Sequence, residues 1–82
     1  MTTLTLLSRA YCHLCDELRD ALAVVIAGRD VRVVELDVDA HPALEPRYGD
    51  LVPVLLLGDV EHGRELCHYR LDDAAVRRAL AA

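Results

Sequence analysis

Two cysteines separated by two residues form the most reactive group in this sequence. Cys12 and Cys15 lie in the stretch R-A-Y-C-H-L-C-D-E-L, near the start of a chain of 82 residues. Such a pair can exchange electrons by forming a disulfide, or it can hold a soft metal ion through two thiolates. A bare C-x-x-C also arises by chance, so the surrounding sequence has to separate these possibilities.

The composition predicts one small domain over residues 1–82. Hydrophobic residues make up 54% of the chain, which is enough for a core, and the net charge is −5. This charge disfavours nucleic acid or an anionic membrane as a partner. The sequence has neither the basic start of a signal peptide nor the ~20 apolar residues of a membrane helix. We therefore expect a cytoplasmic monomer that binds neither nucleic acid nor membrane.

The number of cysteines also bears on the function. Three cysteines are too few, and odd in number, for the disulfide framework of a secreted protein. In a reducing compartment, a C-x-x-C is a redox or metal motif before it is a structural bridge.

The first half of the chain predicts a strand, a helix and a second strand. Residues 3–7 are β-prone, and residues 31–36 are largely β-branched. Between them, residues 12–27 repeat apolar side chains at helical spacing, and Gly28 follows as a helix end. The apolar positions of this amphipathic helix are Leu14, Leu18, Ala21, Leu22 and Val25.

The second half predicts a short helix, two strands and a last helix. The short helix starts near Pro42 and ends at Gly49. Residues 52–57 form an apolar run typical of a strand covered on both faces, and a turn at residues 59–63 leads to a hairpin partner at residues 65–69. Asp72 is a suitable N-cap for a helix over residues 73–81, with Leu71 and Val76 as its hydrophobic staple.

This order, β-α-β-α-β-β-α, predicts an α/β fold with three layers. The first two strands are joined through a helix, which implies a parallel, right-handed crossover, and the last two form an antiparallel hairpin. The result is a mixed four-stranded sheet with helices on both faces.

The predicted elements place Cys12 in the turn after the first strand, at the start of the first helix. Free backbone N–H groups and the helix dipole stabilise a thiolate there. Cys15 lies one turn further along, where the helix shields it. The spacing therefore predicts that Cys12 attacks a disulfide and Cys15 resolves the product. Arg9 and protonated His13 are candidates to add positive charge, although each is also explained as a solvated surface residue.

Two further positions are candidates for contact with a substrate. Tyr11 is expected to pack in the turn and to touch a bound partner incidentally. Pro53 opens the third strand, where a missing N–H donor is tolerated. The Val52–Pro53 bond could be trans, like most such bonds, or cis. If it is cis, the backbone of Val52 could turn outward beside Cys12 and pair with an extended substrate.

Two segments resemble a known family over essentially the whole chain. T-L-L-S-R-A-Y-C-H-L-C, followed by R-Y-G-D-L-V-P-V-L, is similar to the thioredoxin superfamily, specifically to small dithiol glutaredoxin-like proteins. The resemblance implies a thioredoxin-like fold of the glutaredoxin type. It also implies a cis proline facing the cysteines, with Val52 and Pro53 at the site that binds the substrate backbone. Arg9 and Asp72 resemble residues that meet the carboxylate and the amine of glutathione.

The sequence departs from that family at two places. The usual C-P-Y-C centre is C-H-L-C here, and H-Y-R-L replaces the Gly-Gly pair before the last helix. We therefore expect weak glutathione binding. The W-C-G-P-C centre of an ordinary thioredoxin is also absent.

These observations favour a thiol-disulfide oxidoreductase that acts on protein disulfides or glutathione mixed disulfides. Its reducing equivalents would come from glutathione or a thioredoxin-type reductase, and it needs no metal or cofactor. The alternatives are a thiolate metal-binding module, a non-catalytic thioredoxin-fold adaptor, and an iron–sulfur glutaredoxin, which generally uses a C-G-F-S centre. Copper chaperones with C-x-x-C have a different element order and typically a Met where Ala10 stands.

The third cysteine and the histidines carry less chemistry. Cys67 falls in the predicted fourth strand and is expected to be a small buried hydrophobe. A zinc site that combines Cys12, Cys15, Cys67 and His68 is conceivable but lacks a second spaced pair of ligands. His41 and His62 fall in predicted loops.

Overall fold

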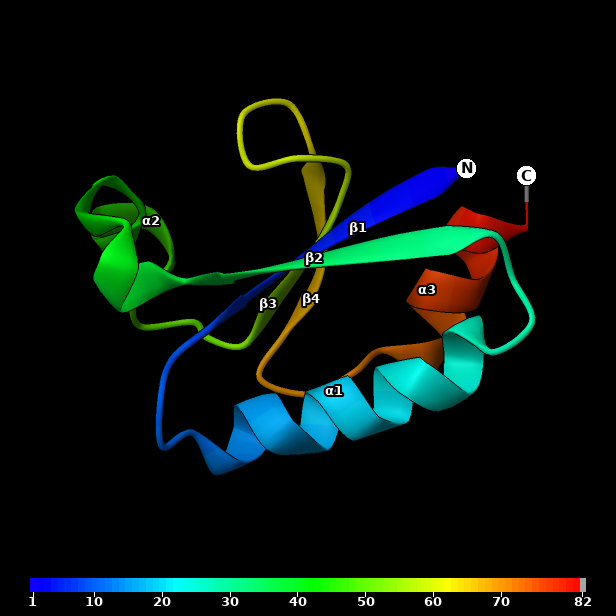
Figure 1. The fold of residues 1–82 in the computed structure, drawn as a ribbon, viewed down its shortest axis with the longest axis horizontal. Coiled ribbons are helices and arrows are strands. Elements are labelled where there is room, and N and C mark those ends of the chain that lie inside the picture. The colour runs from blue at the N-terminus through cyan, green and yellow to red at the C-terminus, as the bar shows by residue number, and fades with distance from the viewer. Residues whose placement is uncertain (82) are drawn as a thin grey trace.

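A computed structural model describes residues 1–81 of the chain, and its elements follow the predicted order (Figure 1). The strands are β1 (Thr2–Ser8), β2 (Val31–Asp37), β3 (Val54–Leu57) and β4 (Arg64–His68). The helices are α1 (His13–Ile26), α2 (Glu45–Tyr48) and α3 (Asp73–Leu80), and two short 3₁₀ helices, Val38–Ala40 and Pro42–Leu44, precede α2.

The four strands form one mixed sheet in the order β2-β1-β3-β4. β1 and β2 are parallel, and β3 is antiparallel to both β1 and β4. The parallel crossover and the hairpin are therefore confirmed. The sequence did not predict that β3 pairs with β1. This antiparallel pairing brings the end of β1 and the start of β3 to the same end of the sheet.

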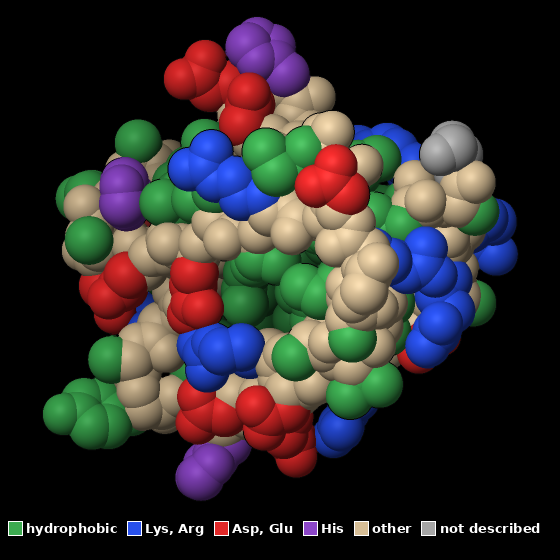
Figure 2. Space-filling view, turned by 45° about the vertical axis from the view of Figure 1, so that its right-hand side comes forward, with side chains coloured by type: hydrophobic (Ala, Val, Ile, Leu, Met, Phe, Trp, Pro, Cys, Tyr) green, Lys and Arg blue, Asp and Glu red, His purple; other side chains and the backbone are tan. Residues whose placement is uncertain are grey.

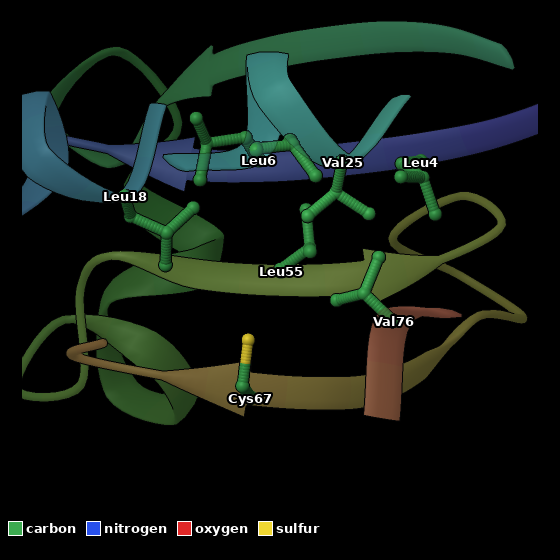
Figure 3. Packing of buried hydrophobic residues seen from close by; sticks show 8 residues of the cluster. Leu4, Leu6, Leu18, Val25, Leu55, Cys67 and Val76 are labelled. Carbon is green, nitrogen blue, oxygen red and sulfur yellow. The ribbon is translucent and has the colours of Figure 1, made fainter. Parts of the chain in front are cut away.

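Helices cover both faces of the sheet, so the expected three layers are confirmed. Alternate residues of β1 and β3 supply the two cores because successive side chains of a strand point to opposite faces. On one face, Leu4, Leu6 and Leu55 pack with side chains from α1 and α3, such as Leu18 and Val76 (Figure 3). On the other face, Leu7, Val54 and Leu56 pack with Val38 and Tyr48, from the segment that carries α2.

Several predicted boundaries differ from the observed ones by a residue or two, for example those of β1 and β4. Three of the differences concern α1, β3 and the short helix. Cys12 is the N-cap of α1 and not its first helical residue. β3 begins at Val54 and not at residue 52, which agrees with the missing N–H donor of Pro53. The predicted short helix is divided into two 3₁₀ helices and the four-residue α2. Pro42 and Pro46 remove the N–H groups that a longer helix would need.

Candidate functional site: the Cys12–Cys15 corner

The two cysteines lie where β1 gives way to α1, as the sequence predicted. They are joined by a disulfide, and their Cα atoms are 5.2 Å apart. Cys12 has an extended backbone as the N-cap, and the N–H of Cys15 donates a hydrogen bond to its Sγ at 3.1 Å. The sulfur of Cys12 therefore takes the place that a serine or aspartate oxygen occupies at an ordinary helix start.

The two cysteines differ sharply in exposure. Cys12 is partly exposed, whereas Cys15 has none of its surface exposed and lies within the helix. A reagent or substrate approaching from solvent therefore meets Cys12 first. Asp16, next in the chain, would place a negative charge beside the pair, but its carboxylate accepts a hydrogen bond from Arg19 at 2.8 Å.

Arg19 fastens the first turns of α1 to the sheet. Its guanidinium donates two hydrogen bonds to the carboxylate of Glu35 on β2, at 2.9 and 2.5 Å. Ser8, at the end of β1, donates a third to Glu35 at 2.7 Å. Hydrogen bonds from Arg19, the largest influence, and from Ser8 lower the pKa of Glu35 below its ordinary value of 4.5, against the opposing effect of partial burial. The helix start that carries the cysteines is therefore tied to both parallel strands.

The Val52–Pro53 bond lies at the same end of the sheet as the cysteine turn. This peptide bond is cis. Because Leu7 pairs with Val54, the antiparallel register puts Pro53 opposite Ser8, just before the turn that leads to Cys12. Pro53 is buried and Val52 is partly exposed. The carbonyl of Pro53 accepts a hydrogen bond from the N–H of Tyr69 at 2.8 Å.

Tyr69 is a residue of this site that the sequence analysis missed. Its N–H binds Pro53, and its hydroxyl donates a hydrogen bond to the carbonyl of Asp50 at 2.9 Å. Tyr69 therefore holds the segment that precedes β3 at two points. Its φ is 64°, in the left-handed region that glycine adopts without strain. The sequence offered one signal for Tyr69: H-Y-R-L stands where the family has a Gly-Gly pair. A tyrosine in that segment adopts a backbone conformation that glycine adopts without strain.

Tyr11 adjoins Cys12 and points into solvent. Its side chain is fully exposed and its φ is 59°. The expectation that it packs in the turn is therefore wrong, because the fully exposed ring has no packing surface. Tyr11 and Tyr69 are the two non-glycine residues with positive φ among residues 1–81; Tyr11 adjoins Cys12 in the chain and Tyr69 binds Pro53. Contact between Tyr11 and a partner stays a prediction.

Arg9 lies three residues before Cys12, but its guanidinium is engaged within the protein. It donates to Asp39 at 3.1 Å, to Glu45 at 2.6 Å and to the carbonyl of Gly49 at 3.3 Å. These partners fasten the α2 segment to the end of β1. A substrate carboxylate would therefore have to compete with two carboxylates for this arginine.

Asp72 caps α3, as its position predicted. Its Oδ1 accepts a hydrogen bond from the N–H of Ala75 at 3.0 Å. This bond satisfies one of the free N–H groups at the helix start and accounts for the aspartate without a ligand. A contact between Asp72 and a substrate amine stays a prediction.

Cys67 lies apart from the pair, in the core beneath α1. It is a buried free cysteine on β4 whose thiol faces Leu18 and Leu55 (Figure 3). Burial raises the pKa of this thiol above its ordinary value of 9.0, although the backbone N–H of Asp72 opposes the shift. No group of three or more His, Cys, Asp or Glu side chains suited to a metal ion occurs within residues 1–81. The conceivable zinc set of the sequence analysis is therefore not brought together.

Residues 3–81 match the family described as Glutaredoxin-like domain (DUF836). The chain belongs to this family. The resemblance to the thioredoxin superfamily that the sequence suggested is thereby confirmed.

Relatives of this glutaredoxin-like protein come from several bacteria. The uncharacterized protein Rv0508 of Mycobacterium tuberculosis is 33% identical over an alignment of 81 positions, which covers 93% of this chain and 79% of the relative. The solution structure of protein Ne2328 from Nitrosomonas europaea has a TM-score of 0.82 and 33% identity, covering 96% of this chain and 91% of that one. Oxidized mitochondrial thioredoxin 3 from Saccharomyces cerevisiae has a TM-score of 0.70 at 20% identity, covering 98% and 76%. This last likeness shows the fold alone.

The surface of this glutaredoxin-like protein carries charges of both signs. Acidic and basic side chains are interspersed around an apolar hollow on the face seen in Figure 2. Among the described residues, no helix has the length and apolar character that crossing a membrane requires. A glutaredoxin-like fold with a disulfide-bonded cysteine pair at the start of α1 supports a redox role.

Proposed function

We propose that this protein is a dithiol-disulfide oxidoreductase in which Cys12 attacks and Cys15 resolves. One observation carries the proposal: the two bonded cysteines differ in access, because Cys12 is partly exposed at the helix start and Cys15 is buried behind it. Disulfide exchange needs one sulfur that a substrate can reach and a second that can reach the first.

The reaction balances in two steps. The Cys12 thiolate attacks one sulfur of a substrate disulfide, which forms a mixed disulfide and releases the other substrate sulfur as a thiolate. Cys15, deprotonated, then attacks Sγ of Cys12, which releases the second substrate thiol. The substrate gains two electrons and the protein is left with the Cys12–Cys15 disulfide. A thiol donor, either glutathione or a thioredoxin-type reductase, returns the protein to its dithiol form.

The local geometry favours a thiolate on Cys12 over one on Cys15. The N–H of Cys15 donates to the Cys12 sulfur at 3.1 Å, and the positive end of the α1 dipole lies at the same position. Because Arg19 binds Asp16, the nearest carboxylate opposes this stabilisation less. The scheme needs no metal and no bound cofactor.

Substrate would bind at the end of the sheet where Cys12, Val52 and Pro53 lie. Val52 is partly exposed just before β3, so its backbone is available to pair with an extended segment of a substrate. We propose that Tyr11, which is exposed beside Cys12, contacts the same segment. We place the reaction in a reducing cytoplasm, with disulfide-containing proteins or glutathione mixed disulfides as substrates and the monomer as the active species.

The test is a single turnover of the reduced protein with 2-hydroxyethyl disulfide, followed by intact-mass analysis. The wild type should release both thiols and gain the internal disulfide. Cys12→Ser should release none, whereas Cys15→Ser should release one thiol and keep the other as an adduct. Peptide mapping should locate that adduct on Cys12.

The matched control is Cys67→Ala, which removes a cysteine outside the corner and should behave as the wild type. Reduction by Cys12→Ser at the wild-type rate, or an adduct on Cys15, would contradict the assigned roles.

A further inference from the structure

A groove lies between α1 and the connection from β4 to α3, and its α1 wall begins at Glu17, two residues after Cys15. Figure 1 shows α1 and this connection side by side. It has a volume of about 360 Å³. Apolar side chains from both walls line it, and one acid and one base stand at its rim. The lining residues are Glu17, Leu18, Ala21, Tyr69, Arg70 and Leu71.

Tyr69 contacts both this groove and the end of the sheet where substrate is proposed to bind. Its side chain lines the groove, while its N–H binds the carbonyl of Pro53 at 2.8 Å. On the opposite wall, Glu17 and Leu18 lie on α1 shortly after Cys15. When the cysteine of an extended substrate lies at Cys12, a substrate side chain next to that cysteine can therefore reach the groove.

The charges around the corner disfavour an anionic substrate. Arg19 is held between the carboxylates of Asp16 and Glu35. Arg9 is likewise held between Asp39 and Glu45. Each arginine that flanks the cysteine pair in sequence thus sits in a cluster of net charge −1.

The groove rim adds no net charge, because Glu17 and Arg70 oppose each other there. Glutathione is a small tripeptide with two carboxylates and one ammonium group. Arg9 and Arg19 already bind carboxylates of the protein, and glutathione has too little apolar surface to fill the groove.

Resting on the proposed function, we propose that the groove is a subsite for a polypeptide disulfide. It receives an apolar side chain next to the substrate cysteine, in a segment without acidic residues. The site thereby selects proteins over glutathione. The chemistry is the exchange already described: Cys12 bonds to the substrate sulfur, the partner sulfur leaves as a thiolate, and Cys15 completes the two-electron transfer.

The experiment compares mixed disulfides of thionitrobenzoate, so that the leaving group is constant. One short peptide has leucine beside its cysteine, a second has serine there, and a third has glutamate. Glutathione and 2-mercaptoethanol supply the anionic and the minimal substrates. Reduced protein is mixed with each in a single turnover, and the released thionitrobenzoate is followed by absorbance.

The leucine peptide should react at least about tenfold faster than the serine peptide, as burial of an apolar side chain in a pocket allows. The glutamate peptide and glutathione should be slower still. Equal rates for the leucine and serine peptides would overturn the subsite. If 2-mercaptoethanol–thionitrobenzoate itself is not reduced, the proposed function fails, and the inference that rests on it fails too.

Two variants on α1 locate the effect in the groove. Ala21→Tyr fills the groove, and Ala23→Tyr places the same side chain at another exposed position of the helix. Ala21→Tyr should lower the rate for the leucine peptide, relative to the 2-mercaptoethanol substrate, by about fivefold or more. Ala23→Tyr should leave that ratio unchanged, and an equal fall in both variants would overturn the assignment.

A double variant of the carboxylates that bind Arg9 tests the effect of charge on selection. Asp39→Asn combined with Glu45→Gln removes both carboxylates from Arg9 and leaves its guanidinium for a ligand. The rate for the glutathione substrate should then rise by about twofold to fivefold, the range expected for one exposed charge pair. An unchanged glutathione rate would overturn the claim that these carboxylates shape the selection.

Discussion

The cysteines of this protein occupy two regions with opposite surroundings. Cys12 and Cys15 lie at a helix start, where a backbone N–H binds sulfur and one of the two side chains reaches solvent. Cys67 lies on β4 among Leu18 and Leu55, where burial raises the pKa of its thiol. The same side chain thus forms a disulfide at a partly exposed helix start in one region and fills apolar space in the other.

The two regions are also held together by different forces. Hydrogen bonds and ion pairs position the corner, chiefly those of Arg9 and of Arg19 with Glu35. The core around Cys67 is held by close apolar packing of fully buried leucines and valines. Changes in the corner should therefore affect reactivity and pH response, whereas changes in the core should affect stability.

The largest expected contrast is in thiol reactivity. The fully reduced protein, treated with iodoacetamide near neutral pH, should be alkylated first at Cys12. Cys67 should react at least about 100-fold more slowly, because burial both protects the thiol and disfavours its thiolate. Mass mapping of the modified sites against time measures this order. In urea the three cysteines should react at similar rates, and faster labelling of Cys67 or Cys15 than of Cys12 in the native protein would invert the comparison.

The next contrast is in stability. Leu55→Ala should lower the free energy of unfolding by about 2–5 kcal/mol, because it leaves a cavity in the core that also contains Cys67. Tyr11→Ala, at a fully exposed position of the corner, should change it by no more than about 0.5 kcal/mol. Urea unfolding followed by circular dichroism measures both. Comparable losses for the two variants would mean that the corner contributes packing energy that its exposure does not suggest.

The smallest expected contrast is in acid stability. The pKa of Glu35 is lowered in the folded protein, so its contribution to stability is present above the ordinary pKa of 4.5 and is lost as pH falls through the folded value. The wild type should therefore lose more stability between pH 7 and acid pH than Glu35→Gln does. Urea midpoints across that range measure the difference. Glu61→Gln, at an exposed turn, is the matched control, and identical acid responses for Glu35→Gln and the wild type would refute this role of the Arg19 pair.

Local sequence determined most of the elements and the position of the cysteine pair. Apolar spacing set α1, Asp72 and its neighbours set the start of α3, and the continuous apolar run at residues 54–56 set a strand buried on both faces. These features depend on residues a few positions apart, whose geometry the backbone fixes by itself. For the same reason the sequence placed Cys12 at a helix start and Cys67 in the core.

Tertiary structure alone decided which residues from distant segments surround the cysteine corner. Arg9 finds its acidic partners 30 and 36 residues away, and Tyr69 binds Asp50 across 19 residues. The left-handed backbone of Tyr69 has no signature in its own side chain. The groove likewise exists only because β3 pairs with β1 and carries β4, with the chain that follows it, beside α1. Contacts between distant segments depend on sheet order and register, which local preferences along the chain do not specify.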